Sequence, residues 1–272
     1  QACIAVVTPE HFFLFDIGDR ASFRIAEARL PTDRLTGIFL THFHSDHIAD
    51  VPSVNMNSWI QGRDSKLNVY GPQGVETVIG GFNMAYQLDK TYRTAHHGAD
   101  LLPAATAAMN PITITPGIAF QDANIKITAF LVDHAPIDPA MGYRVDYKDR
   151  SVVISGDTVS TDSLFIAAKD ADLLLHDALS EPALAAVIAA IKASGNDRTA
   201  TIVSDVHDYH AHSTNLEAQS KKAGIKQLAF YHMVPVPTMP LIEKIFERGI
   251  SSDVILTKDL MYKILYVKFS LL

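Results

Sequence analysis

Short apolar runs of strand length recur along the chain, and they restrict the fold more than any other feature of the sequence. Each run is rich in β-branched or aromatic residues, and most end in Gly, Pro, Asp or His, as strands do. The expected strands cover residues 3–7, 12–15, 37–40, 67–70, 112–115, 118–120, 125–132, 143–147, 151–154, 172–175, 227–231 and 264–267.

Helical patterns lie between some of these strands. Apolar residues at positions 184, 187, 188 and 191 follow Pro182 with helical spacing, and Thr214 with Glu217 forms a capping-box pattern before a helix that runs to Lys222. The first half is richer in strand pairs with short links, such as 112–115 with 118–120, while the second alternates strand and helix. We therefore expect an α/β fold in which two mixed sheets pack face to face with helices outside, a four-layer αββα sandwich, as a single domain over residues 1–272.

Composition narrows the classes of function. The chain is 48% hydrophobic and 19% charged, which is typical of a soluble globular protein, and no apolar run approaches the roughly 18 residues that span a bilayer. Composition leaves the compartment, cytoplasm or periplasm, open. The 23 basic and 30 acidic residues give a net charge of −7, which disfavours nucleic acid, although a local basic patch could still bind it. Cys3 is the one cysteine, so metal ligands must be His and carboxylate. Because the chain starts at Gln1, we expect that a leader was removed or that the natural sequence starts earlier.

A cluster of histidines follows the expected strand that ends at Leu40. In extended backbone, His42 and His44 project to the same face, and a turn into a helix would offset Asp46 and His47 to a second point nearby. A solvated loop explains one isolated histidine but not three with an aspartate at this spacing. The segment therefore predicts ligands for two metal ions.

The pattern His-x-His-x-Asp-His after a strand resembles the metallo-β-lactamase superfamily, and later residues match that family's other motifs in order. The resemblance implies that His134 is a ligand of the first metal, Asp157 bridges both metals, and His232 is the last ligand of the second. It also implies that Asp16 supports the site without binding metal. The first metal would then bind His42, His44, His134 and Asp157, and the second would bind Asp46, His47, His232 and Asp157.

Two dications that share a carboxylate lower the pKa of a water between them, so a bridging hydroxide at neutral pH is the expected nucleophile. The ligands suit two Zn²⁺ best, and Mn²⁺ or Fe also fits them.

Within the superfamily, residues 142–145, 155–158, 175–177 and 212–214 resemble the tRNase Z branch with its arylsulfatase and phosphodiesterase relatives. This resemblance implies that His212 acts beside the metals, with Asp177 orienting its ring; the family more often has Glu at that place. Asp46 is expected to be catalytic as well as a ligand. The alternative is that His212 only caps the following helix.

The sequence also bears on the substrate. Residues 148–150 form a tight turn where many bacterial tRNase Z enzymes insert a tRNA-binding arm, so a small anionic ester is favoured over tRNA. Residues 89–100 are expected to form a loop in which Arg93 or His97 could contact an anionic substrate, although a solvated loop explains them equally well. His207 and His210 could shape the rim of the pocket, but we expect them to lie in an exposed loop. Trp59 could line a pocket for an aromatic leaving group, but we expect it to lie in a helical core.

The expected function is therefore a dinuclear-metal hydrolase that cleaves a sulfate or phosphate (di)ester, of the arylsulfatase or phosphodiesterase type. The alternatives are a tRNase Z-type RNA 3′-processing endonuclease, a lactone or β-lactam hydrolase, and a metal-binding interaction module without activity. No membrane association is expected, and a homodimer is compatible with the sequence. The intact ligand set favours an enzyme, because buried charges without a cation are costly.

Overall fold

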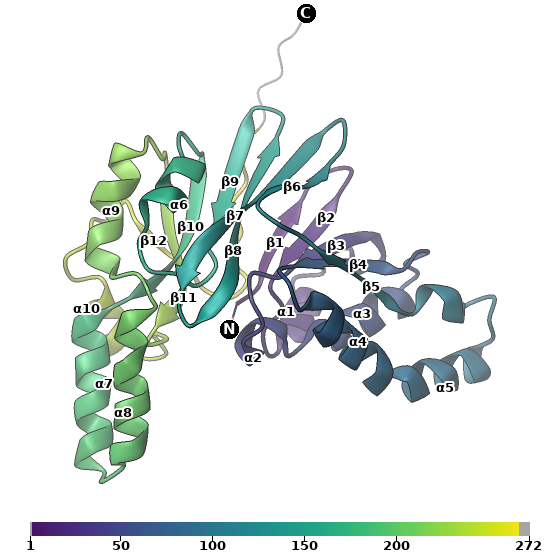
Figure 1. Cartoon of the computed structure of the whole chain (residues 1–272), viewed down its shortest axis with the longest axis horizontal. Helices are drawn as coiled ribbons and strands as arrows, with labels where there is room; N and C mark the ends of the chain where they lie inside the picture. The colour runs from purple at the N-terminus through teal and green to yellow at the C-terminus, as the bar shows by residue number, and fades with distance from the viewer. Residues whose placement is uncertain (1, 267–272) are drawn as a thin grey trace, which may run out of the picture. The chain divides into compact units, whose positions relative to one another are not determined.

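The computed structural model describes residues 2–266 and divides the chain into two compact units, Gln1–Thr115 and Pro116–Leu272 (Figure 1). Each unit contains one sheet with helices, so the predicted α/β class is confirmed. The single domain over residues 1–272 stays a prediction. Over the described residues, the helices are all too short or too polar to cross a bilayer.

The first unit is built on a five-stranded sheet with the order β1-β2-β3-β4-β5. Only β1 runs antiparallel to its neighbour. The continuous apolar sequence of β2 is buried on both faces, and β3 is buried except at Thr36, which is half-buried. The elements are β1 (Ile4–Val7), β2 (Phe12–Phe15), α1 (Ala21–Glu27), η1 (Thr32–Arg34), β3 (Leu35–Phe39), α2 (Ser45–Ile48), α3 (Val51–Ile60), β4 (Leu67–Gly71), α4 (Val75–Ala85), α5 (Gln87–His97), η2 (Ala104–Thr106) and β5 (Met109–Thr113).

The second unit is built on a seven-stranded sheet with the order β12-β11-β10-β9-β8-β7-β6. Strands β9 to β12 are parallel, and β6 to β9 form antiparallel hairpins. Helices α7 and α8 form a hairpin that extends away from this sheet (Figure 1). The elements are β6 (Gly117–Gln121), β7 (Ile125–His134), β8 (Ile137–Tyr147), β9 (Arg150–Ile154), α6 (Asp162–Ala167), β10 (Leu173–Leu179), α7 (Glu181–Ala193), α8 (Asp197–Asp205), η3 (Val206–Asp208), α9 (Ser213–Lys222), β11 (Leu228–Val234), α10 (Pro240–Phe246) and β12 (Ile255–Leu256).

Most expected strands are confirmed within a few residues, but two expectations are wrong. Residues 112–115 and 118–120 do not pair with each other, because β5 joins the first sheet beside β4 while β6 joins the second beside β7. Thr115 and Pro116 between them are where the two units divide. The strand expected over 264–267 is not formed at residues 264–266, and Val267 lies outside the described residues.

The helices after Pro182 and around Thr214 are confirmed as α7 and α9. The capping box is wrong, because the Glu217 carboxylate accepts hydrogen bonds from Lys221 Nζ (2.6 Å) and Ser251 N (3.0 Å) instead. The loop expected over 89–100 is also wrong, because residues 87–97 form α5, which ends at Gly98. Nothing in that stretch breaks a helix, since its first Gly or Pro is Gly98.

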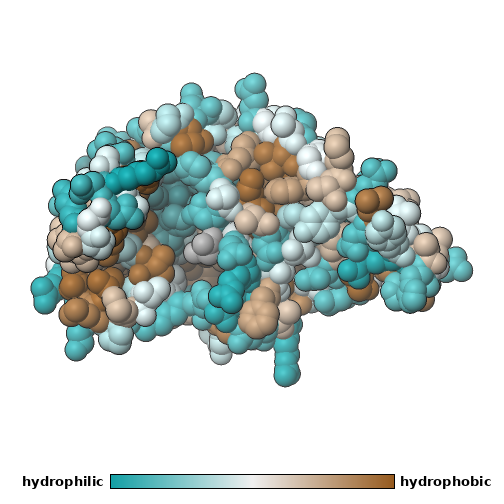
Figure 2. All heavy atoms as spheres, turned by 90° about the horizontal axis from the view of Figure 1, so that it is seen from below, coloured by the Kyte–Doolittle hydropathy of each residue, from teal (hydrophilic) through white to brown (hydrophobic). Residues whose placement is uncertain are grey.

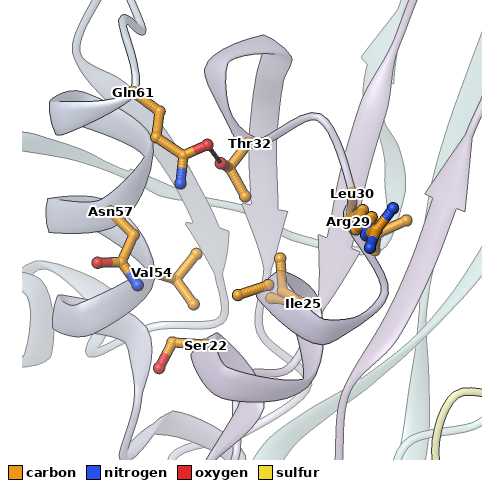
Figure 3. Close-up of a pocket in the computed structure, with 9 residues that line it drawn as sticks. Ser22, Ile25, Arg29, Leu30, Thr32, Val54, Asn57 and Gln61 are labelled. Carbon is orange, nitrogen blue, oxygen red and sulfur yellow. Dashed lines mark hydrogen bonds between the residues drawn. The ribbon is translucent and has the colours of Figure 1, made fainter.

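Helix α3 belongs to the core of the first unit. Trp59 is buried, as expected, and its Nε1 donates to Pro103 O at 3.2 Å. A cavity of about 270 Å³ lies between α1 and α3, where Thr32 Oγ1 donates to Gln61 Oε1 at 2.8 Å (Figure 3). Its lining residues include none of the predicted site residues, so we assign the cavity no part in the site.

Candidate metal centre

The carboxylate of Asp16 organises the histidine cluster of the first unit. Asp16 follows β2 with a positive φ of 54°, and it is 1% exposed. Its oxygens accept from Thr41 N (2.8 Å) and Thr41 Oγ1 (2.9 Å), and they lie 2.9 Å from His47 Nδ1. This contact fixes the tautomer of His47 and leaves its Nε2 as the atom that can bind a cation.

Two pairs of donor atoms follow β3. The chain is extended at His44 and enters α2 at Ser45, as the spacing predicted. His42 Nε2 lies 3.0 Å from His44 Nδ1, and Asp46 Oδ2 lies 3.7 Å from His47 Nε2. Two ligands of one tetrahedral Zn²⁺ at about 2.0–2.1 Å lie about 3.3 Å apart, so each pair has the separation that a shared cation requires.

The second unit carries the other three predicted ligands, at the end of β7, after β9 and within β11. His134 ends β7, is 1% exposed, and has its Nδ1 3.1 Å from Tyr209 O, which leaves Nε2 as the atom that can bind a cation. Asp157 follows β9, and its Oδ1 lies 3.3 Å from His232 Nδ1. A hollow of about 300 Å³ at the turn between β7 and β8 includes His134 in its lining.

Irregular backbone places His134 and His232. The β7–β8 register shifts between Val132 and His134, and the β10–β11 register shifts so that His232 is skipped in the pairing. His232 also has a positive φ of 44°. Bulges and left-handed non-glycine residues of this kind gather at functional sites, where they redirect a side chain.

His210 joins the candidate site, although the sequence analysis favoured an exposed loop for it. It was expected in an exposed loop, but it is 5% exposed, and its Nδ1 donates to Asp177 Oδ2 at 2.8 Å. Donor atoms of His210, Asp157 and His232 lie within 4.8 Å of one another. The Asp177–His210 pair therefore lies beside two of the predicted ligands.

The predicted pairing of Asp177 with His212 is wrong, and the strand register gives the reason. His212 lies beside Leu179 in a parallel bridge, which aligns the residue two positions earlier, His210, with Asp177. His212 instead has its Nδ1 3.1 Å from Glu181 Oε1. The alternation of histidines at 210 and 212 was the signal that could have found this, since both fall on one face of an extended segment.

The two predicted substrate contacts lie on α5 in the first unit. Arg93 Nε lies 3.1 Å from Asp89 Oδ1 one helical turn away, so the charge of Arg93 already has a partner. His97 is exposed near the end of the helix. A substrate role for these two residues stays a prediction.

The donor set fits a divalent transition metal. The ligand atoms are imidazole nitrogens and carboxylate oxygens, which suit Zn²⁺. Two of the histidines, His47 and His134, have their second nitrogen held by Asp16 and by Tyr209 O. Such partners are typical of metal-binding histidines, because they orient the ring and make it more basic.

Comparison with known proteins gives the family. Residues 14–233 match the model of the beta-lactamase superfamily domain. A ribonuclease Z of Mycobacterium sp. (strain KMS) is 30% identical over 227 residues, covering 83% of this chain and 75% of that protein. A ribonuclease Z of Mycobacterium bovis (strain BCG / Pasteur 1173P2) is 31% identical, covering 82% and 76%.

Solved structures agree in fold. The metallo-beta-lactamase fold protein YhfI from Bacillus subtilis has a TM-score of 0.64 at 19% identity, covering 95% of this chain and 89% of its own. The short form of human tRNase Z has a TM-score of 0.64 at 21% identity, covering 96% and 90%. Zn²⁺-bound PqqB from Methylobacterium extorquens has a TM-score of 0.57 at 14% identity, covering 95% and 85%. At these identities the likeness shows the metallo-β-lactamase fold alone.

Proposed function

Because the chain belongs to the beta-lactamase superfamily, in its ribonuclease Z-like branch, we propose that it is a metal-dependent phosphodiesterase that cleaves RNA, as a tRNase Z-type 3′-processing endonuclease. The observation that carries this proposal is the buried Asp177–His210 pair beside Asp157 and His232. A proton donor next to metal ligands is what phosphodiester hydrolysis requires, because the leaving oxygen must be protonated as its bond to phosphorus breaks.

The proposed metal centre keeps the ligand set that the sequence resemblance implies. His42, His44, His134 and Asp157 would hold one ion, and Asp46, His47, His232 and Asp157 would hold the other. When bound, two Zn²⁺ would supply Lewis acidity toward the phosphoryl oxygens and would lower the pKa of water. The donor separations of 3.0, 3.7 and 3.3 Å within each unit support this assignment.

The protein's own groups have distinct roles in this proposal. Asp177 accepts from His210 Nδ1 and favours the protonated ring, so the proton for the leaving oxygen would come from Nε2 of the His210 imidazolium. Asp16 keeps His47 and Thr41 in place and has no direct part in the chemistry. Asp46 is proposed as a ligand that also orients the attacking water. Its side chain is 41% exposed, so a carboxylate oxygen can contact water from solvent.

The sulfatase interpretation receives no support from the relatives named above, which are ribonucleases Z. The net charge of −7 argued against nucleic acid, but it sums over the whole chain and does not describe the surface that faces a substrate. An RNA 3′ end therefore replaces the small anionic ester as the proposed substrate.

Substrate comparison tests the proposal. The Zn²⁺-loaded chain is assayed on a precursor tRNA, bis-p-nitrophenyl phosphate, p-nitrophenyl sulfate and a lactone, before and after removal of metal with EDTA. We expect the highest kcat/KM on precursor tRNA and loss of activity with EDTA that added Zn²⁺ restores. Preferred turnover of the sulfate or the lactone would overturn the proposal.

A further inference from the structure

We propose that Glu181, His207 and His212 form an additional metal site that binds one divalent transition-metal cation, preferentially Zn²⁺. The site lies in the second unit, at the base of the α7–α8 hairpin, and shares no ligand with the metal centre proposed above. The pairing of His212 with Glu181, in place of Asp177, is what revealed it.

The distances between donor atoms fit one cation. Glu181 Oε1 lies 3.1 Å from His212 Nδ1 and 3.7 Å from His207 Nδ1. One donor atom from each of the three residues lies within 4.8 Å of the other two. The two distances to Glu181 Oε1 are close to the spacing of about 3.3 Å between ligands of a tetrahedral Zn²⁺.

The chemistry of the three ligands also favours a transition metal. Two imidazoles and one carboxylate form a set that zinc proteins use, with a fourth position for water. The side chains of His207 and His212 are 32% and 35% exposed, so a cation can reach them from solvent. A hard cation such as Mg²⁺ prefers oxygen ligands and would bind less well.

The three ligands come from the ends of three helical segments. Glu181 is the first residue of α7, His207 lies in η3 directly after α8, and His212 directly precedes α9. A cation bound by all three would tie both ends of the hairpin to the start of α9.

The hairpin has little other packing to hold it. Helix α7 buries only Ala183 and Leu184, and α8 buries only Ala200, while Ile202 is 55% exposed. Hydrophobic residues are visible among hydrophilic ones at the left of Figure 2, the side on which Figure 1 draws α7 and α8. A metal at the base would therefore restrict a segment that has few buried apolar contacts.

Zinc content is the direct test. The full chain and its His207→Gln variant are equilibrated with Zn²⁺ by dialysis, and bound zinc is measured by mass spectrometry. We expect the variant to lose one zinc per chain, whatever number the other ligands hold. His96→Gln removes an exposed histidine from α5 and is expected to retain all the zinc.

Hydrogen exchange tests whether a bound cation restricts the motion of the α7–α8 hairpin. Zn²⁺ should slow amide exchange over residues 181–208 in the unsubstituted chain and leave it unchanged in His207→Gln. Glu181→Gln, which keeps the side chain's length, should behave like His207→Gln. Equal zinc content in the unsubstituted chain and both variants, with equal exchange, would overturn the proposal and leave an imidazole–carboxylate hydrogen bond only.

Discussion

His210 Nδ1 donates a hydrogen bond of 2.8 Å to the Asp177 carboxylate, and both side chains are buried. A buried carboxylate that accepts from one ring nitrogen orients the ring and stabilises its protonated form, in which the other nitrogen can donate a proton. This relationship makes His210, two residues before the histidine that the sequence favoured, the proposed proton donor.

Asp177→Asn tests the orienting role. The amide keeps the shape but loses the charge that holds His210, so we expect kcat on precursor tRNA to fall roughly 10- to 1000-fold with a much smaller change in KM. Asp177→Glu retains the carboxylate and should recover part of the loss. An Asp177→Asn enzyme with normal kcat would show that the pair has only a structural role.

Asp16→Asn tests support of the metal centre. Replacing the carboxylate weakens the contact that orients His47, so we expect Zn²⁺ affinity to fall about 10- to 100-fold, as measured by competition with a chelator. Asp19→Asn changes an exposed aspartate in the turn before α1 and serves as the matched control. Equal affinities in the two variants would exclude the support role.

Glu217 is predicted to make the free energy of unfolding depend on pH in the acid range. The hydrogen bond from Lys221, followed by that from Ser251 N, lowers the pKa of Glu217 to about 2. A carboxyl group whose pKa is lower in the folded state than in the unfolded state stabilises the folded state at pH values above its unfolded pKa. This stabilisation is lost as the pH falls through the pKa of the folded state. The free energy of unfolding of Glu217→Gln should thus fall below that of the unsubstituted chain near neutral pH, and the difference should shrink between about pH 5 and pH 2. A difference that is constant across this range would contradict the prediction.

Arg63 is predicted to hold the end of α3. It is 3% exposed, and its guanidinium donates to Ser58 Oγ (3.0 Å), Asn55 Oδ1 (2.8 Å) and Thr106 O (3.1 Å). Burial lowers its pKa to about 10, so it stays charged at neutral pH.

Arg63→Met leaves those acceptors without a donor and should lower the free energy of unfolding by about 2–4 kcal/mol in urea denaturation. Lys66→Met removes an exposed positive charge close in sequence, and it is expected to change the free energy of unfolding by less than about 0.5 kcal/mol. A similar small effect in both variants would contradict the role given to Arg63.

Much of the fold could be predicted from sequence because strands such as β2 and β4 are short apolar runs with clear ends. The extended-then-helical course at His44 and Ser45 also follows from local spacing. The partner of β5 could not be predicted, because a short link to the next strand indicates a hairpin unless the competing sheet is known.

The same limit applies to the site. The positions of Asp16 and His47 follow a motif, whereas the choice between His210 and His212 depends on the register of residue 212 against Leu179. Register between segments separated by a long insertion is a tertiary property that local patterns do not contain.

The most direct measurement is single-turnover cleavage of a precursor tRNA by the Zn²⁺-loaded chain and by its His210→Ala variant, with the zinc content of both determined beforehand. The account predicts cleavage by the unsubstituted chain and a roughly 100- to 10,000-fold slower rate for a variant that still binds RNA. Equal rates for the two proteins, or no cleavage by a fully metal-loaded chain, would contradict it.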